Sequence, residues 1–204
     1  MNKELNTINM YRLRVSVFCS SSSLVSQKFI DESVELAKSL VNENHLVQYG
    51  GGAVGLMGHL SKTVLFLNGN IRGFIPQFMI DEGWNNVDVK DMVVVKDMQD
   101  RKREIMMETD AIVSLAGGYG TLEELTEAIT LKQLGLIDIP IIIVNTDGFY
   151  NPLLKMFEKM KQENFIRPAH CDIWQTVNRA IDVVPALLNA PAWDAENARN
   201  SAAI

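Results

Sequence analysis

The segment 116–124 combines residues that could bind an anion with residues that would repel one. It reads AGGYGTLEE and follows the apolar run 111–115. Three glycines let backbone N–H groups converge on one point without Cβ clashes. Thr121 stands where the N-cap of a helix starting at Leu122 belongs, at the positive end of the helix dipole. This build is typical of a phosphate cradle.

Two carboxylates, Glu123 and Glu124, directly follow that loop. Because phosphate repels carboxylate, we expect them to point at another part of the ligand, such as a bond to be broken near the phosphate. A second interpretation is structural. Thr121-x-x-Glu124 is also a capping box, in which Glu124 only accepts a bond from the Thr121 N–H. The pattern alone fits both.

A charged cluster at 97–103, DMQDRKR, opens another expected helix. Arg101 and Lys102 near a helix start oppose the helix dipole, which is mildly unfavourable. Such a placement indicates a function, since the arginine fork can hold a phosphate or a planar base. A solvated charge cluster is an equally weighted alternative.

Other loops offer weaker signals. Gly50-x-Gly52-x-x-Gly55 matches the dinucleotide fingerprint, but it follows the second expected strand and lacks the acidic residue about twenty positions on. We interpret it as a tight turn that also contacts ligand. Ser20 and Ser21 could hydrogen-bond a ribose or phosphate, or form a simple turn, and we favour ligand contact. Cys19 has no histidine nearby in sequence, so a buried structural thiol is favoured over a nucleophile.

Composition narrows the class of protein. The 204 residues are 47% hydrophobic and 22% charged, as in an ordinary globular domain. A net charge of −6 argues against a nucleic-acid surface. No apolar run reaches the ~20 residues of a membrane span, and no signal peptide is expected. The two cysteines and three scattered histidines give no disulfide framework and no metal-ligand spacing. We therefore expect a cytoplasmic protein with no metal.

Apolar strands alternate with helices along the chain, which predicts an α/β fold with a central parallel sheet flanked by helices. Such sheets place their sites beyond the carboxyl ends of the strands. We expect one domain over 1–190 and a flexible tail over 191–204 that has little to bury. The expected strands are 13–18, 46–49, 70–75, 92–95, 111–115 and 140–144, and the expected helices are 26–44, 55–67, 100–108, 122–136, 150–163 and 176–188.

Several spaced motifs together resemble the LONELY GUY (LOG) family of cytokinin riboside 5′-monophosphate phosphoribohydrolases, often mislabelled lysine decarboxylases. The family signature P-G-G-x-G-T-x-x-E lies over 116–124, and M-x-x-R-K lies over 98–102. The resemblance spans roughly 14–168, and its further matches lie at 49–52, 55–58, 133–135 and 148–154.

The resemblance implies a Rossmann-like homodimer, without cofactor, that hydrolyses the N-glycosidic bond of an N6-substituted adenosine 5′-monophosphate to free base and ribose 5-phosphate. It implies catalytic roles for Arg101 and Glu124. Together with the loop residues above, the expected substrate-binding set is Ser20, Ser21, Gly51, Gly52, Glu82, Lys102, Gly117, Gly118, Tyr119, Gly120, Thr121, Leu122, Glu123 and Thr130. Glu82 corresponds to the family's acidic residue after its Ile-Pro motif.

The chain also departs from the family pattern. Ala116 replaces the usual proline, Ser20 a glycine, Gln99 a common histidine and Leu131 a common tryptophan. The last two concern the pocket and the dimer face, so they affect substrate identity more than reaction class.

The expected chemistry fits these residues. Glycosidic cleavage develops positive charge at C1′, which Glu124 could stabilise. Arginine keeps its proton and is a hydrogen-bond donor rather than a general acid. A pyridoxal-phosphate decarboxylase would need a Schiff-base lysine, for which Lys62 and Lys102 give no sign. The second hypothesis is a nucleotide-binding or carrier protein without turnover.

Overall fold

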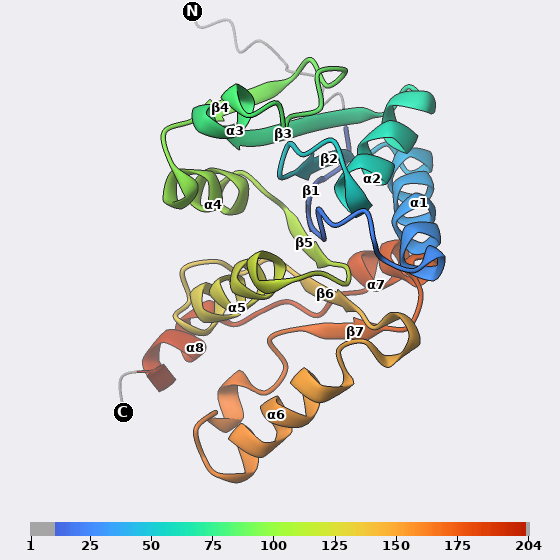
Figure 1. The fold of residues 1–204 in the computed structure, drawn as a ribbon. Helices are drawn as coiled ribbons and strands as arrows, with labels where there is room; N and C mark the ends of the chain where they lie inside the picture. The colour runs from blue at the N-terminus through green and yellow to red at the C-terminus, as the bar shows by residue number, and fades with distance from the viewer. Residues whose placement is uncertain (1–10, 203–204) are drawn as a thin grey trace, which may run out of the picture.

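A seven-stranded parallel sheet forms the centre of the computed structural model, which describes residues 11–202 (Figure 1). The strand order is β4-β3-β2-β1-β5-β6-β7. The chain builds one half outward from β1 and then returns to build the other half from β5, so the order reverses between these two strands. The strands are β1 Arg14–Phe18, β2 Leu46–Tyr49, β3 Asn70–Pro76, β4 Met92–Val95, β5 Ala111–Ser114, β6 Ile141–Val144 and β7 Gln175–Val177.

Helices cover both faces of the sheet, which confirms the predicted three-layer α/β fold (Figure 1). Side chains alternate along each strand, so Val113 joins the core under α1, α2 and α7 while Ile112 joins the core under α4 and α5. The helices are α1 Gln27–Asn42, α2 Gly55–Phe66, α3 Gln77–Asp81, α4 Met98–Met107, α5 Tyr119–Gln133, α6 Asn151–Gln162, α7 Val183–Leu188 and α8 Ala195–Ala202. None of them, within the described residues, is long and apolar enough to cross a membrane.

The predicted helix over 176–188 is wrong. Gln175–Val177 instead forms β7, which pairs in parallel with β6, and only Val183–Leu188 is α-helical. Pro185 stands inside the predicted helix and cannot donate a backbone hydrogen bond there. The sheet offers this short segment backbone partners that the local pattern does not reveal.

The expectation that the C-terminal segment has little to bury is also wrong. Ala198 is 1% exposed, and the segment is bonded to the end of α5. Trp193 Nε1 donates to Lys132 O at 3.1 Å, and Arg199 Nη2 donates to Gly135 O at 2.7 Å. The division of the chain at residue 190 stays a prediction.

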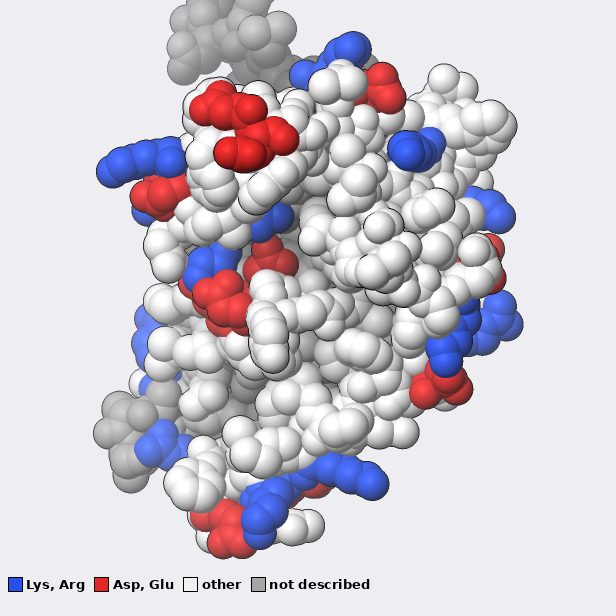
Figure 2. Space-filling view, in the orientation of Figure 1, with Lys and Arg blue, Asp and Glu red and all other residues white. Residues whose placement is uncertain are grey.

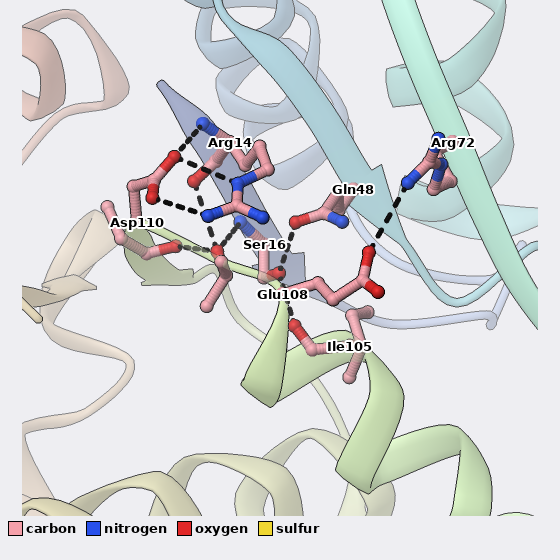
Figure 3. Close-up of polar contacts among 9 residues, drawn as sticks. Arg14, Ser16, Gln48, Arg72, Ile105, Glu108 and Asp110 are labelled. Carbon is pink, nitrogen blue, oxygen red and sulfur yellow. Dashed lines mark hydrogen bonds and ion pairs between the residues drawn. The ribbon is translucent and has the colours of Figure 1, made fainter. Parts of the chain in front are cut away.

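A buried polar network fixes the C-terminal end of α4 to the sheet (Figure 3). The hydroxyl of Ser16, in the middle of β1, donates to Ile105 O at 2.8 Å. Thr109 Oγ1 accepts from the Ser16 N–H at 3.2 Å. Asp110 binds the Arg14 guanidinium. Ile105 O is one of the last four carbonyls of α4, which lack partners inside the helix. The Ser16 hydroxyl supplies the hydrogen-bond donor that this carbonyl needs.

We predict that Ser16→Ala lowers the free energy of unfolding by about 1–3 kcal/mol, because it leaves a buried carbonyl with one partner fewer. Urea denaturation of both chains measures the difference. Ser23→Ala, at an exposed loop position, is the control and should change stability by less than about 0.5 kcal/mol. Equal unfolding midpoints for Ser16→Ala and the parent chain would contradict the structural role.

Candidate active site

A cleft with a volume of about 710 Å³ lies beyond the carboxyl ends of the central strands. It is lined by the loop after β1, the glycine turn after β2, the end of β3, α4 and the start of α5. Charged side chains of both signs gather between α4 and α5 (Figure 2). The site therefore lies where the strand order reverses, as expected for an open parallel sheet.

The start of α5 forms one wall of this cleft. The helix begins at Tyr119 with Gly118 as its N-cap, and no side chain caps it. Its first backbone bond runs from Leu122 N to Gly118 O at 3.0 Å. The N–H groups of Tyr119, Gly120 and Thr121 precede this bond and have no intrahelical partner. These donors lie at the positive end of a 15-residue helix.

The predicted N-cap role of Thr121 is wrong, and with it the capping box. Thr121 is the third residue of the helix and is 4% exposed. A Cβ on Gly117 would lie 2.1 Å from Thr121 Oγ1, so the chain turns tightly against this side chain. Tyr119 and Gly120 form the first turn despite the poor helix propensity of glycine, because the extended Gly118 already starts the helix.

Two glycines of this loop leave open space. A Cβ built on Gly118 or Gly120 would meet no atom of the described residues within 4 Å, and both residues line the cleft. Packing therefore does not demand glycine at these positions. Open space above unpaired N–H groups is what a bound anion requires.

Arg101 crosses the floor of the cleft and contacts three separate segments. Its Nε donates to Phe74 O at 2.9 Å, Nη1 to Glu124 Oε1 at 3.1 Å and Nη2 to Gly50 O at 3.1 Å. A Cβ on Gly50 would lie 1.7 Å from Nη2, so only glycine permits this approach. The side chain is 9% exposed, and the alternative of a solvated charge cluster is wrong for Arg101.

Glu124 is buried beside this guanidinium. Burial raises the pKa of its carboxyl group, the Arg101 charge opposes that rise, and Glu123 adds to it. Cys19 also lines the cleft, and burial raises the pKa of its thiol. The thiol stays protonated, which agrees with a structural role for Cys19.

Lys102 points to the neighbouring carboxylates of α5. Its Nζ pairs with Glu127 Oε2 at 3.0 Å and with Glu123 Oε1. The hydrogen bond to Glu123 is the main cause that raises the pKa of Lys102. Lys102 and Glu123 thus lie beside the cleft without lining it.

The structure brings most of the predicted site residues together. The cleft lining includes Ser20, Ser21, Gly52, Arg101, Gly118, Tyr119, Gly120, Thr121 and Glu124. Three others, Gly51, Gly117 and Leu122, are sequence neighbours of lining residues.

Two further predicted residues lie outside the lining and are not sequence neighbours of the residues in it. Glu82 is exposed at the end of α3, and Thr130 is exposed on α5, where its Oγ1 donates to Thr126 O at 2.8 Å. Their substrate-binding roles stay predictions.

Sequence reasoning missed an apolar part of the cleft. Its lining residues are Val54, Met57, Ile75, Met79 and Trp84. Trp84 reaches the site because Ala53 N donates to Trp84 O at 3.0 Å, beside a bridge between Gly52 and Asn85. No local pattern predicts that long-range pairing. Across residues 11–202, no group of three or more His, Cys, Asp or Glu could hold a metal ion.

Comparison with known proteins gives consistent matches. The family model described as "Possible lysine decarboxylase" matches residues 57–187. Cytokinin riboside 5′-monophosphate phosphoribohydrolase LOG5 of Arabidopsis thaliana is 38% identical over 174 residues, which cover 85% of this chain and 76% of that protein. The LOG3 enzyme of the same plant is 39% identical over 174 residues, which cover 85% of this chain and 81% of that protein. The probable phosphoribohydrolase LOGL2 of Oryza sativa subsp. japonica is 44% identical over 156 residues, 76% of this chain and 64% of that protein.

Solved structures share the fold at low sequence identity. The molybdenum cofactor carrier protein of Chlamydomonas reinhardtii has a TM-score of 0.64 at 17% identity, covering 86% of this chain and 97% of that chain. The molybdenum cofactor binding protein of Rippkaea orientalis has a TM-score of 0.65 at 17% identity, covering 88% and 99%. At such identity the likeness concerns the fold alone.

We predict that Glu124→Gln raises the free energy of unfolding at pH 7. A carboxyl group whose pKa is raised on folding stabilises the folded state below its unfolded pKa, and this contribution is lost as the pH rises through the folded value. At pH 7 the buried, ionised Glu124 therefore lowers the free energy of unfolding, and a neutral glutamine at this position removes that loss. Urea denaturation at pH 7 and near pH 4 measures the effect, which should shrink at the lower pH. Glu163→Gln, at the exposed end of α6, is the control. If the Glu124→Gln chain were less stable than the parent chain at pH 7, the expectation would be refuted.

Proposed function

Because the chain belongs to the LOG family of cytokinin riboside 5′-monophosphate phosphoribohydrolases, we propose that its cleft hydrolyses the N-glycosidic bond of an N6-substituted adenosine 5′-monophosphate. Water replaces the base at C1′, and the products are a free base and ribose 5-phosphate. One observation carries the assignment to this cleft: the buried Arg101–Glu124 pair adjoins the uncapped start of α5.

The start of α5 is the proposed phosphate site. The unpaired N–H groups at its first turn supply several parallel donors, and the helix dipole favours an anion there. The open space over Gly118 and Gly120 gives the phosphate room to approach. Ser20 and Ser21 also line the cleft, and we assign their hydroxyls to the oxygens of the phosphate or of the ribose.

Glu124 is the proposed catalytic carboxylate. As the glycosidic bond breaks, positive charge develops at C1′. A buried carboxylate stabilises that charge strongly, because little water competes with it. In its ionised form Glu124 can also orient the attacking water. Its raised pKa implies that this ionised form is lost at a higher pH than for an exposed glutamate.

Arg101 is the proposed electrophilic partner. Three of its five N–H donors hold Phe74 O, Glu124 and Gly50 O, so the remaining two have no partner among the described residues. They are available to the phosphate or to the departing base. Arg101 also favours the ionised form of Glu124, since its charge opposes the rise in pKa that burial causes.

The base belongs at the apolar end of the cleft. Met79 and Trp84 are apolar residues of the lining, and the Trp84 side chain is half exposed. A half-exposed indole provides a flat surface on which a purine or an apolar N6 substituent can pack.

We also propose a homodimer in the cytoplasm. Apolar side chains are exposed along and after α5, including Leu122, Leu134 and Leu136, with Tyr119 95% exposed at its start. A second copy would cover such a surface. Cys19 and Cys171 are both free thiols, which suits a reducing compartment.

The decisive experiment compares turnover and binding in one variant. Glu124→Gln should keep its fold and its affinity for adenosine 5′-monophosphate, while the hydrolysis rate falls about a hundredfold or more. Chromatography of products, calorimetric titration and thermal melting measure the three properties, with Glu163→Gln as the matched control. Near-normal hydrolysis in folded Glu124→Gln would reject the catalytic assignment. Binding without turnover in the parent chain would favour a carrier.

We expect hydrolysis to depend on the 5′-phosphate. Adenosine lacks the group that the start of α5 would hold, so its kcat/KM should lie about a hundredfold or more below that of its monophosphate, as for a lost charge-assisted contact. Rates of free-base release from both compounds measure the ratio. Equal cleavage would refute the phosphate site.

We expect a dimer at micromolar concentration. Multi-angle light scattering gives the mass directly, against 22.8 kDa for one chain. Leu136→Glu, at a 61% exposed position after α5, should weaken the dimer because it places a charge on an apolar surface. Leu188→Glu, also exposed but on α7, should leave the mass unchanged. A monomeric parent chain would contradict the proposal.

A further inference from the structure

A second cavity, of about 270 Å³, lies at the other end of α5 from the cleft. It forms where the last turn of α5, the start of β6, the segment before β7 and the C-terminal segment meet. It shares no lining residue with the cleft. Lys132, which lines it, is 4% exposed.

The amine of Lys132 is unusual because it is buried without a carboxylate partner. Among the described residues it forms no salt bridge; its recorded contact is with the Trp193 ring, whose centroid lies 5.1 Å from Nζ. A buried ammonium is costly without a counter-ion. Accordingly, burial lowers the pKa of Lys132 to about 8, although the nearby Asp138 charge opposes the shift.

The cavity is lined by two indole rings and further apolar side chains, together with two acidic residues. Trp193 is held in place because its Nε1 donates to Lys132 O at 3.1 Å. Trp174 and Ile173 also line the cavity. Asp172 and Asp194 are exposed lining residues. The two carboxylates disfavour an anionic ligand, while the indoles favour a neutral ring.

We propose that Lys132 is a nucleophilic amine that condenses with uncharged aromatic or apolar aldehydes in this cavity. The amine nitrogen adds to the aldehyde carbon, the carbonyl oxygen leaves as water, and an imine remains on Nζ. The step needs no oxidant or reductant. It uses the neutral amine, as other lysines that form Schiff bases do.

The fraction of the amine that is neutral at pH 7 distinguishes Lys132 from ordinary lysines. With a pKa of about 8, about one amine in ten is neutral at pH 7, against about one in 2,500 for an unperturbed lysine at about 10.4. Preferential reaction at neutral pH therefore distinguishes this site from nonspecific surface labelling.

The test uses the full chain with benzaldehyde and cyanoborohydride, which traps the imine as a benzylamine. Peptide mass spectrometry then compares labelling at Lys132 with the exposed Lys38 and Lys159. We expect at least tenfold faster labelling of Lys132 at pH 7, with a half-maximal rate near pH 8. Lys132→Arg should lose this label and keep the slow surface labelling, whereas Lys38→Arg should keep it.

A second probe tests the ligand class. 4-Carboxybenzaldehyde should label Lys132 more slowly than benzaldehyde does, because Asp172 and Asp194 repel it. Surface lysines labelled as fast as Lys132 in the parent chain would overturn the proposal, and this result does not depend on whether any variant folds. Preference for the carboxylated probe would also overturn it, because the cavity would then select anions.

Discussion

The buried pairing of Arg101 with Glu124 is the constraint on which the cleft depends. The guanidinium joins α4 to the end of β2, to β3 and to α5 in one place. Removing the Arg101 charge would leave the Glu124 carboxylate buried and uncompensated, which is strongly unfavourable. The pair therefore ties the position of the carboxylate to the geometry of the sheet. The absence of a side chain at Gly50 is part of the same constraint, since a Cβ there would occupy the place of Nη2.

Helix α4 is held at both ends, and this explains how so short a helix keeps Arg101 in position. At its start, Asp97 caps the helix by accepting from Gln99 N and Asp100 N, both at 2.9 Å. At its end, the Ser16 hydroxyl donates a hydrogen bond to Ile105 O, inside the network of Figure 3. Strand β1 thus fixes the end of the helix, and the helix determines where the guanidinium lies. The favourable cap also offsets the unfavourable placement of Arg101 and Lys102 near the start of the helix.

Much of the fold follows from local pattern, because strands buried on both faces are continuous apolar runs. Ile141–Val144 is recognisable in this way. Gln175–Val177 is not, since it lies at the sheet edge, is only partly buried, and owes its conformation to pairing with β6. The site divides similarly. Type and spacing single out Arg101 and Glu124 as candidates and leave a structural interpretation open for each, whereas Trp84 enters the cleft through a backbone pairing with the glycine turn. The isolation of Lys132 depends on Trp193, sixty-one positions away.

The position of Glu124 along α5 determines in which orientation a charged ligand fits the cleft. Thr121 and Glu124 are three residues apart, so they lie on one face of the helix and about 4.5 Å apart along its axis. An anion bound at the first turn would therefore lie about one turn from the carboxylate, close enough for repulsion in a buried site. Arg101, paired with Glu124 at 3.1 Å, reduces that repulsion. A ligand with a negative end and a carbon that becomes positive one turn away complements this arrangement, while the reversed ligand places like charges together. The same helix thus binds the anion through its backbone and stabilises the developing cation through a side chain.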